Sequence, residues 1–223
     1  VASPYDAFIL EEDGQLTEQI LHEYIGMNLS YAPRVWQAST AAKAMEMLSK
    51  RKYDLVIVGL RISDMDPLTL GRMIKESDPQ KPVILLVFDE SELQQLPQII
   101  PKEIIDKVFV WSGDAGVFPA IIKLLEDRKN VNRDIKRGHI RLIMLVEDNP
   151  RYYSMLLPLI YKEILFHTRQ MLSKSLNDTH RLLHMRGRAK VLLASTYEEA
   201  ERYFKRYGSN ILGIISDIRF PKE

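Results

Sequence analysis

Short apolar runs alternate with amphipathic stretches along the whole sequence, and this alternation restricts the chain to few folds. The first half contains such runs at 7–10, 34–38, 55–60, 83–88 and 108–111. The run LVIVGL at 55–60 is entirely apolar, as expected of a strand buried on both faces of a parallel sheet. The stretches between the runs carry apolar residues three to four positions apart, which indicates helices. Residues 1–127 are therefore predicted to form a doubly wound α/β domain with a parallel five-stranded sheet.

The same pattern starts again after a charged segment. Residues 128–139 are rich in charge and poor in large apolar side chains, and we expect a solvated linker there. An apolar strand, a long helical region over about 151–186 and two more strands follow, the last of them leading to Asp217. Residues 140–223 are therefore predicted to be the N-terminal part of a second domain of the same fold, truncated after its third strand.

The two halves also resemble each other in sequence. The repeat pairs residues 8–13 (FILEED) with 144–149 (MLVEDN), residues 37–40 (QAST) with 193–196 (LAST), and Gly59 with Asp217. The second half carries about 20 extra residues between the first two of these matches, within its long helical region. The alternative is chance similarity, because short apolar strands look alike.

Acidic residues follow two strands of the second half. Glu147 and Asp148 come directly after its first strand, and Asp217 comes after its third. In a 2-1-3 strand order these two strands are neighbours, and ligand sites lie beyond the carboxyl ends of parallel strands. Three carboxylates so close together repel one another unless a hard cation such as Mg²⁺ joins them. A carboxylate beside Mg²⁺ can attack a phosphoryl donor, whereas the alternative is that these acids are solvated loop residues.

This pattern resembles that of response-regulator receiver domains. In that family an apolar strand is followed by an acid, Asp and Asn, and a later one by Asp-x-x-x-Pro; here these read LVEDNP and IISDIRFP. The resemblance implies that Asp217 is the phosphoacceptor, that Asp148 and Asp217 bind Mg²⁺, that Glu147 holds a metal-bound water, and that the backbone carbonyl of Arg219 is a further ligand. The family pattern also has a Thr or Ser after the fourth strand and a Lys after the fifth, and the sequence ends at Glu223, before either element.

The first half resembles the same family in architecture but not in chemistry. Gly59 stands at the acceptor position, Val87 at the position of the Thr or Ser, and Ser112 at the position of the Lys. Only Glu11 and Glu12 remain of the acidic set. Because glycine cannot accept a phosphoryl group and valine cannot hydrogen-bond to one, the resemblance implies that residues 1–127 are a pseudo-receiver domain with a degenerate site.

Longer phrases suggest a narrower resemblance over most of the chain. VFVWSGD, LVEDNPRYYSMLLPLIYKEI and RGRAKVLLASTYEEAERYF resemble bacterial proteins in which receiver-like domains precede a module of the pyruvate-phosphate-dikinase or phosphoenolpyruvate-synthase type. The resemblance implies a regulatory segment that is addressed by a histidine kinase or a small phosphodonor and that controls a downstream kinase-like phosphotransferase module. The sequence itself has no active-site His context and no Gly-rich phosphate loop, so we expect no catalytic module within it.

Composition excludes several other classes of protein. The formal net charge of +1, from 31 Lys and Arg against 30 Asp and Glu, removes the bulk electrostatic case for nucleic-acid binding. The absence of cysteine excludes disulfides, thiolate metal sites and cysteine nucleophiles. No apolar run approaches the ~20 residues of a membrane span, and the first residues, VASPYD, lack the basic and apolar regions expected of a signal peptide. We therefore expect a soluble, cytoplasmic protein that binds no membrane.

Two other functions stay open. The chain could be a structural or dimerisation module whose acids are vestigial, and the predicted strand at 211–216 would leave an exposed sheet edge that favours a homodimer. The other is a hydrolase of the Asp/Mg²⁺ type. Such enzymes normally carry a second Asp two residues after the first, and Arg219 at that position argues against this class.

Overall fold

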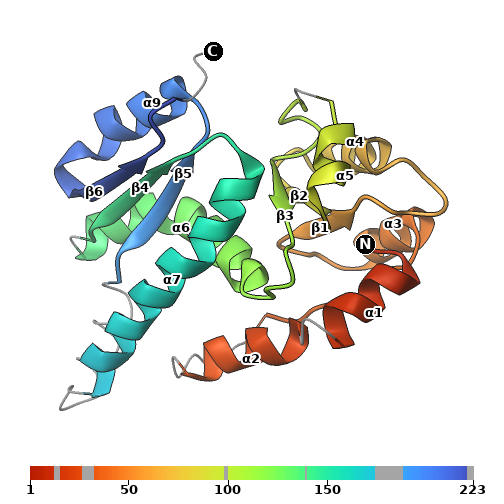
Figure 1. Cartoon of the computed structure of the whole chain (residues 1–223), viewed down its shortest axis with the longest axis horizontal. Helices are drawn as coiled ribbons and strands as arrows, with labels where there is room; N and C mark the ends of the chain where they lie inside the picture. The colour runs from red at the N-terminus through yellow and green to blue at the C-terminus, as the bar shows by residue number, and fades with distance from the viewer. Residues whose placement is uncertain (13–15, 27–32, 98–99, 139, 174–187, 220–223) are drawn as a thin grey trace. The chain divides into compact units, whose positions relative to one another are not determined.

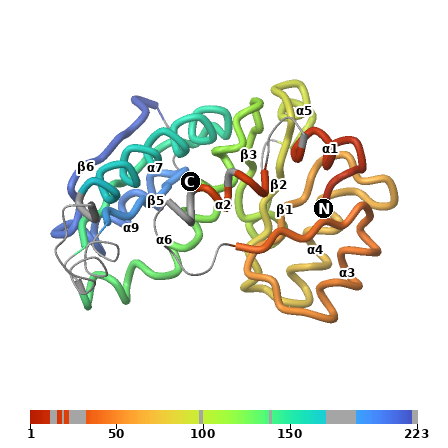
Figure 2. The backbone as a smooth tube through the Cα atoms, turned by 90° about the horizontal axis from the view of Figure 1, so that it is seen from below, coloured from red at the N-terminus to blue at the C-terminus, as the bar shows by residue number. Residues whose placement is uncertain are grey.

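A computed structural model describes residues 1–12, 16–26, 33–97, 100–138, 140–173 and 188–219 (Figure 1). The chain divides into two compact units: unit 1 comprises residues 1–21 and 32–115, and unit 2 comprises residues 22–31 and 116–223. Figure 2 traces the backbone through both. Among the described helices, none is both long enough and apolar enough to cross a bilayer.

Unit 1 is built around a parallel sheet with the strand order β1-β2-β3. Its strands are β1 (Val56–Gly59), β2 (Val83–Val87) and β3 (Lys107–Val110). Every residue of the central strand β2 is buried. Neighbouring strands cover both of its edges, and an apolar cluster packs around Val83 and Leu85. The predicted α/β class and the parallel strand direction are confirmed.

Three helices of unit 1 begin at residues whose side chains cap them. The helices are α3 (Ala41–Lys50), α4 (Pro67–Ser77) and α5 (Glu90–Gln95), with Thr40, Asp66 and Asp89 at their N-caps. Each capping oxygen accepts an N–H three residues further on. Asp64 adds two bonds to the start of α3, from the N–H groups of Ala41 and Ala42 at 2.8 and 3.0 Å. The acids in the loop after β1 therefore serve as helix caps.

Two of the five strands predicted for residues 1–127 are not strands, so the five-stranded sheet is wrong and the unit 1 sheet has three. Residues 7–10 lie in helix α1 (Pro4–Glu12), which precedes α2 (Leu16–Gly26), and residues 34–38 have no regular structure. The helix starts before the apolar run does, because Ser3 Oγ accepts the N–H of Asp6 at 3.1 Å and Pro4 suits a first helical turn. A short apolar run does not by itself distinguish a buried strand from a helix.

Val1 and Ala2 extend the hydrogen bonding of the unit 1 sheet. The carbonyl of Val1 accepts the N–H of Gly59 at 2.7 Å, at the end of β1. On the other side, the N–H of Ala2 donates to the carbonyl of Ala38 at 3.1 Å. These two residues therefore link the segment around Ala38 to β1, as a short strand would.

Unit 2 contains a second parallel sheet, with the strand order β5-β4-β6. Its strands are β4 (Leu142–Val146), β5 (Lys190–Ala194) and β6 (Ile211–Ser216). Strand β5 is buried throughout, whereas β6 at the end of the sheet exposes Leu212, Ile214 and Ile215 by 45 to 66%. The exposed edge strand predicted at 211–216 is therefore present, and a homodimer formed through it stays a prediction.

Helix α6 (Val117–Gly138) is longer than expected. Residues 128–138, predicted to be a solvated linker, form its second half, and the units divide near Ala115. Val131 is buried in this half and clusters with Leu142, Leu192 and Tyr207. The helix packs against β5 and α7, so the charged residues of this segment occupy the outer side of a helix that belongs to unit 2.

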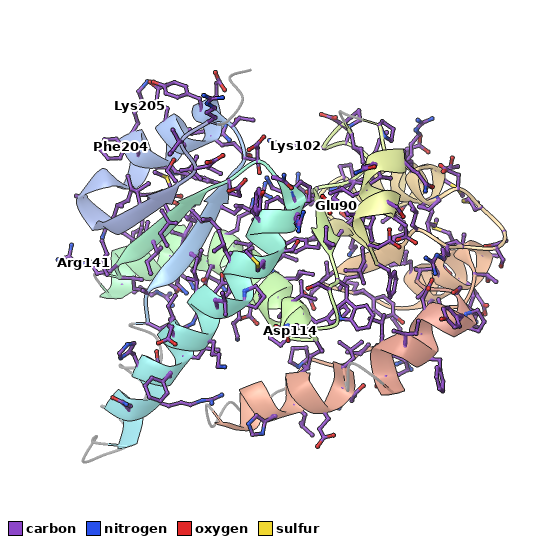
Figure 3. The ribbon with its side chains drawn as sticks, in the orientation of Figure 1. Glu90, Lys102, Asp114, Arg141, Phe204 and Lys205 are labelled. Carbon is purple, nitrogen blue, oxygen red and sulfur yellow. The ribbon has the colours of Figure 1, made fainter. Side chains whose placement is uncertain are left out.

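Helices α7 (Pro150–Ser173) and α9 (Tyr197–Tyr207) complete the described part of unit 2. Pro158 lies inside α7 without ending it, and residues 174–187 of the predicted long helical region lie outside the described residues. Helix α9 begins at the N-cap Thr196, packs on β4 and β5, and exposes Phe204 and Lys205 (Figure 3).

A buried carboxylate fastens α6 to the sheet of unit 2. Asp127 has no exposed surface, and its oxygens accept from Arg188 at 2.6 and 3.1 Å, from the Tyr161 hydroxyl at 3.1 Å and from the Val191 N–H at 3.0 Å. Lys190 approaches Asp127 to 3.4 Å as well. Because a buried charge is tolerated only when it is paired and hydrogen-bonded, this cluster specifies how α6 lies against β5.

Candidate functional site

Three carboxylates meet at the carboxyl edge of the unit 2 sheet. Glu147 and Asp148 follow β4 and Asp217 follows β6, and these strands are direct neighbours, with Val146 opposite Ser216. One carboxylate oxygen of each acid lies within 4.8 Å of those of the other two. The structure thus brings together the three acids that the sequence placed at one sheet edge.

Backbone hydrogen bonds hold these acids in place. The N–H of Asp217 donates to the carbonyl of Val146 at 3.0 Å, and the N–H of Glu147 donates to the carbonyl of Ala194 at 2.9 Å. Both acids are therefore anchored to the central strand or to its neighbour. One oxygen of the Asp217 carboxylate also accepts the N–H of Ile218 at 2.6 Å, which orients the side chain.

The carboxylates affect one another electrostatically. Burial raises the pKa of Glu147, which is only 6% exposed, and the charges of Asp217 and Asp148 raise this pKa further. The backbone N–H of Asn149, which donates to Glu147 at 3.0 Å, acts in the opposite direction. A cation among the three acids would relieve this repulsion.

The donor set suits Mg²⁺. Carboxylate oxygens are the hard ligands that this ion prefers, and Mg²⁺ usually keeps several waters, so three carboxylates on one side of it are sufficient. Arg219, whose backbone carbonyl the receiver resemblance adds to the ligands, lies two residues after Asp217 and is exposed. The residues present therefore fit a divalent cation of this kind.

Three further positions named from the sequence lie at the strand ends of unit 1. Gly59 ends β1, Val87 ends β2 and is completely buried, and Ser112 follows β3 and is exposed. Glu11 and Glu12 follow no strand, because the residues before them form helix α1. Glu11 accepts from Thr17 at 3.0 Å and from Gln37 at 3.2 Å.

The hydrogen bonding identifies two residues that the sequence comparison missed. Gly59 donates to Val1 as Asp217 donates to Val146, and Ala2 donates to Ala38 as Glu147 donates to Ala194. By this criterion Ala2 and Ser3 hold the places in unit 1 that Glu147 and Asp148 hold in unit 2. The matches of Gly59 with Asp217 and of QAST with LAST agree with this register. The match of FILEED with MLVEDN, which rests on its acids, places the pairing nine residues further along the chain.

Comparison with known proteins identifies one domain. Residues 8–109, from α1 into β3, match the response regulator receiver domain family. No curated protein matches the chain. Parallel strands flanked by capped helices agree with this match in unit 1. The chain therefore contains a response regulator receiver domain at residues 8–109.

Proposed function

We propose that this chain is a phosphorelay regulatory segment in which unit 1 is a degenerate receiver and unit 2 is a second receiver that accepts a phosphoryl group on Asp217. A receiver domain implies a regulatory role in phosphorelay signalling, and one occurs at residues 8–109. The observation that carries the finer proposal is the meeting of Glu147, Asp148 and Asp217 at one sheet edge. Phosphoryl transfer to a carboxylate needs such a nucleophile beside a bound cation.

The hydrogen bonds shared by the two units support a common fold. In unit 1 the N–H of Gly59 donates to Val1 and the N–H of Ala2 donates to Ala38. In unit 2 the same two kinds of bond connect the end of β4 to β6 and β5. Two residues beyond each of the paired alanines, Ala38 and Ala194, a threonine caps the next helix. A second receiver in unit 2 accounts for this repetition.

The geometry of the unit 2 acids supports the chemistry that we assign to them. Mg²⁺, when bound, offsets the negative charge of the transferring phosphoryl oxygens. Glu147 and Asp148 hold the cation side of the site, with the Arg219 carbonyl as a further ligand. One oxygen of Asp217 accepts the Ile218 N–H, and we assign the new bond to phosphorus to the other oxygen. The bond from phosphorus to the donor breaks at the same time, and acetate leaves when the donor is acetyl phosphate.

The proposal assigns no phosphoryl chemistry to unit 1. Gly59 offers no nucleophile, Ala2 offers no metal ligand, and Val87 offers no hydroxyl for a phosphoryl group. The phosphodonor of unit 2 is a histidine kinase or a small phosphodonor. The output is a changed contact with a downstream module of the pyruvate-phosphate-dikinase or phosphoenolpyruvate-synthase type in the same protein.

A second candidate function is a structural or dimerisation module without phosphorylation. The exposed apolar residues Leu212, Ile214 and Ile215 on β6 favour it, because an edge strand of this kind readily pairs with another chain.

The intact mass of the protein separates the two functions. Incubation with Mg²⁺ and acetyl phosphate is expected to add one phosphoryl group to the wild-type chain and none to Asp217→Asn. Asp148→Asn is expected to show greatly reduced labelling, whereas Asp64→Asn, which alters a helix-capping acid of unit 1, is the matched control and is labelled normally.

An established receiver domain in the same tube verifies the donor. If that receiver is labelled and the folded wild-type chain is not, the second candidate function replaces the first. If Asp217→Asn keeps the label, the acceptor has been assigned to the wrong residue.

A further inference from the structure

Unit 1 buries two carboxylates at the strand ends where unit 2 has its acidic cluster, but they come from different elements. Asp6 lies in the first turn of α1 and has no exposed surface, and Glu92 lies in α5 and is 5% exposed. Asp6 Oδ1 and Glu92 Oε1 are buried and have no hydrogen-bond partner among the described residues. Two such oxygens are costly to bury unless a positive charge lies close to them.

Arg61 supplies this charge to both acids. Its Nη2 lies 2.7 Å from Glu92 Oε1, and its Nη1 lies 3.6 Å from Asp6 Oδ1. The arginine follows the end of β1 by two residues, the same offset that separates Arg219 from Asp217. One guanidinium therefore bridges two buried carboxylates, while the Arg61 side chain as a whole is 48% exposed.

The remaining oxygens of the two acids tie the bridge to other strand ends. Glu92 Oε2 accepts the N–H of Phe88 at 2.7 Å, directly after Val87 and the end of β2. Asp6 Oδ2 accepts the hydroxyl of Ser3 at 2.8 Å, directly after the segment that bonds to β1. The bridge thus joins three neighbouring strand ends through fixed hydrogen bonds.

We propose that the Arg61 guanidinium is a built-in substitute for a metal ion, which locks the sheet edge of unit 1 in one conformation without Mg²⁺ or phosphate. The proposal rests on the proposed function, in which unit 1 is a degenerate receiver. A receiver with a working site changes state when a cation and a phosphoryl group add charge at its strand ends. In unit 1 the arginine already occupies the space between the two acids and pairs with both, so a cation that entered this edge would have to displace it.

Tryptophan fluorescence tests the proposal, since both tryptophans of the chain, Trp36 and Trp111, lie in unit 1. Trp111 packs against Phe88 beside the bridge, with ring centroids 5.3 Å apart. In urea titrations, Arg61→Ala is expected to raise the unfolding constant about tenfold, because two buried carboxylates lose their counter-charge. Arg72→Ala, which removes an exposed arginine from α4, is the matched control and is expected to change little.

Removal of the acids distinguishes charge compensation from simple packing. Adding Asp6→Asn and Glu92→Gln to Arg61→Ala is expected to recover most of the loss, since no uncompensated charge then remains. If the triple variant is no more stable than Arg61→Ala, or if Arg61→Ala matches the wild type, the proposal is overturned. Should Arg61→Ala fail to fold, the triple variant decides by the same criterion: a folded protein supports the bridge, and an unfolded one rejects it.

A Mg²⁺ titration separates this proposal from the proposed function. The titration uses an Asp148→Asn background, which weakens the unit 2 site. With Arg61 present, millimolar Mg²⁺ is expected to leave the urea midpoint, followed by tryptophan fluorescence, unchanged. Once Arg61→Ala is added, Mg²⁺ is expected to raise this midpoint. A midpoint that rises while Arg61 is present overturns the bridge. None of these readouts depends on Asp217, whose labelling tests the proposed function alone.

Discussion

The two sheet edges of this molecule use the same backbone pattern for opposite electrostatics. In unit 2, Glu147, Asp148 and Asp217 gather negative charge at the ends of β4 and β6. In unit 1 the corresponding bonds surround Ala2 and Gly59, and the nearby acids Asp6 and Glu92 pair with Arg61. A few residues near the strand ends therefore set the charge at each edge.

The interiors of the units differ as well. Both units bury charged groups beside an apolar core, but at different depths. In unit 1 Asp6 and Glu92 pair with the half-exposed Arg61, whereas in unit 2 Asp127 pairs with the buried Arg188 between α6 and β5, where the loss of a partner costs more. Substitutions confined to one unit test whether this difference matters.

The largest effect is expected from Asp127→Asn in unit 2. The substitution leaves Arg188 buried without its carboxylate, and we expect a loss of about 3 to 5 kcal/mol in the stability of unit 2. Hydrogen exchange in β5 measures this loss, and tryptophan fluorescence follows unit 1 separately. If both signals shift together, the two units unfold as one and the comparison between them fails.

Gly71→Ala in unit 1 is expected to have the next largest effect. A Cβ there would lie 2.8 Å from the carbonyl oxygen of Ile104 and 2.9 Å from Ile105 Cδ1, and the backbone carbonyl cannot easily move. We expect a destabilisation of about 1 to 3 kcal/mol by chemical denaturation.

Gly213→Ala in β6 is the control for this substitution. A Cβ at that position meets nothing within 4 Å, so the protein is expected to keep or slightly increase its stability. Equal midpoints for the two variants would contradict the close packing of α4 in unit 1.

The smallest effect is expected from removing a helix cap, of which each unit has an equivalent one. Thr40 accepts the Lys43 N–H at 3.1 Å, and Thr196 accepts the Glu199 N–H at 3.2 Å. Replacing either threonine with alanine is expected to cost about 1 kcal/mol, each in its own unit. Hydrogen exchange at the starts of α3 and α9 locates the loss, and an effect on only one of them would show that the caps are not equivalent.

Local sequence signals predicted a large part of this fold. The apolar runs that became β1, β2 and β3 lie between polar segments, and Thr40 precedes its helix directly, so their structure depends mainly on neighbouring residues. The three acids of unit 2 could also be placed at one edge, because they directly follow strands whose order a doubly wound sheet makes predictable.

Other features were mispredicted because competing local patterns look alike. The apolar residues 8–10 (FIL) favour a strand when they are considered alone. They lie in a helix because α1 begins earlier, where Ser3 accepts the N–H of Asp6. The charged residues 128–138 favour a linker because most of them are polar. In the structure they belong to α6, and the buried Val131 packs that side of the helix against the rest of unit 2. In both cases a helix formed where a short window favoured something else.

The sequence alone determined the strand-end acids of unit 2, the helix caps and the glycine that ends β1, since each follows from residue type and immediate neighbours. Tertiary structure alone decided that Val1 and Ala2 bond to β1 and Ala38, and that Arg61 meets Asp6 and Glu92. Those partners are far apart in the chain, and only the order of the strands and the burial of the carboxylates bring them together and make the pairing favourable.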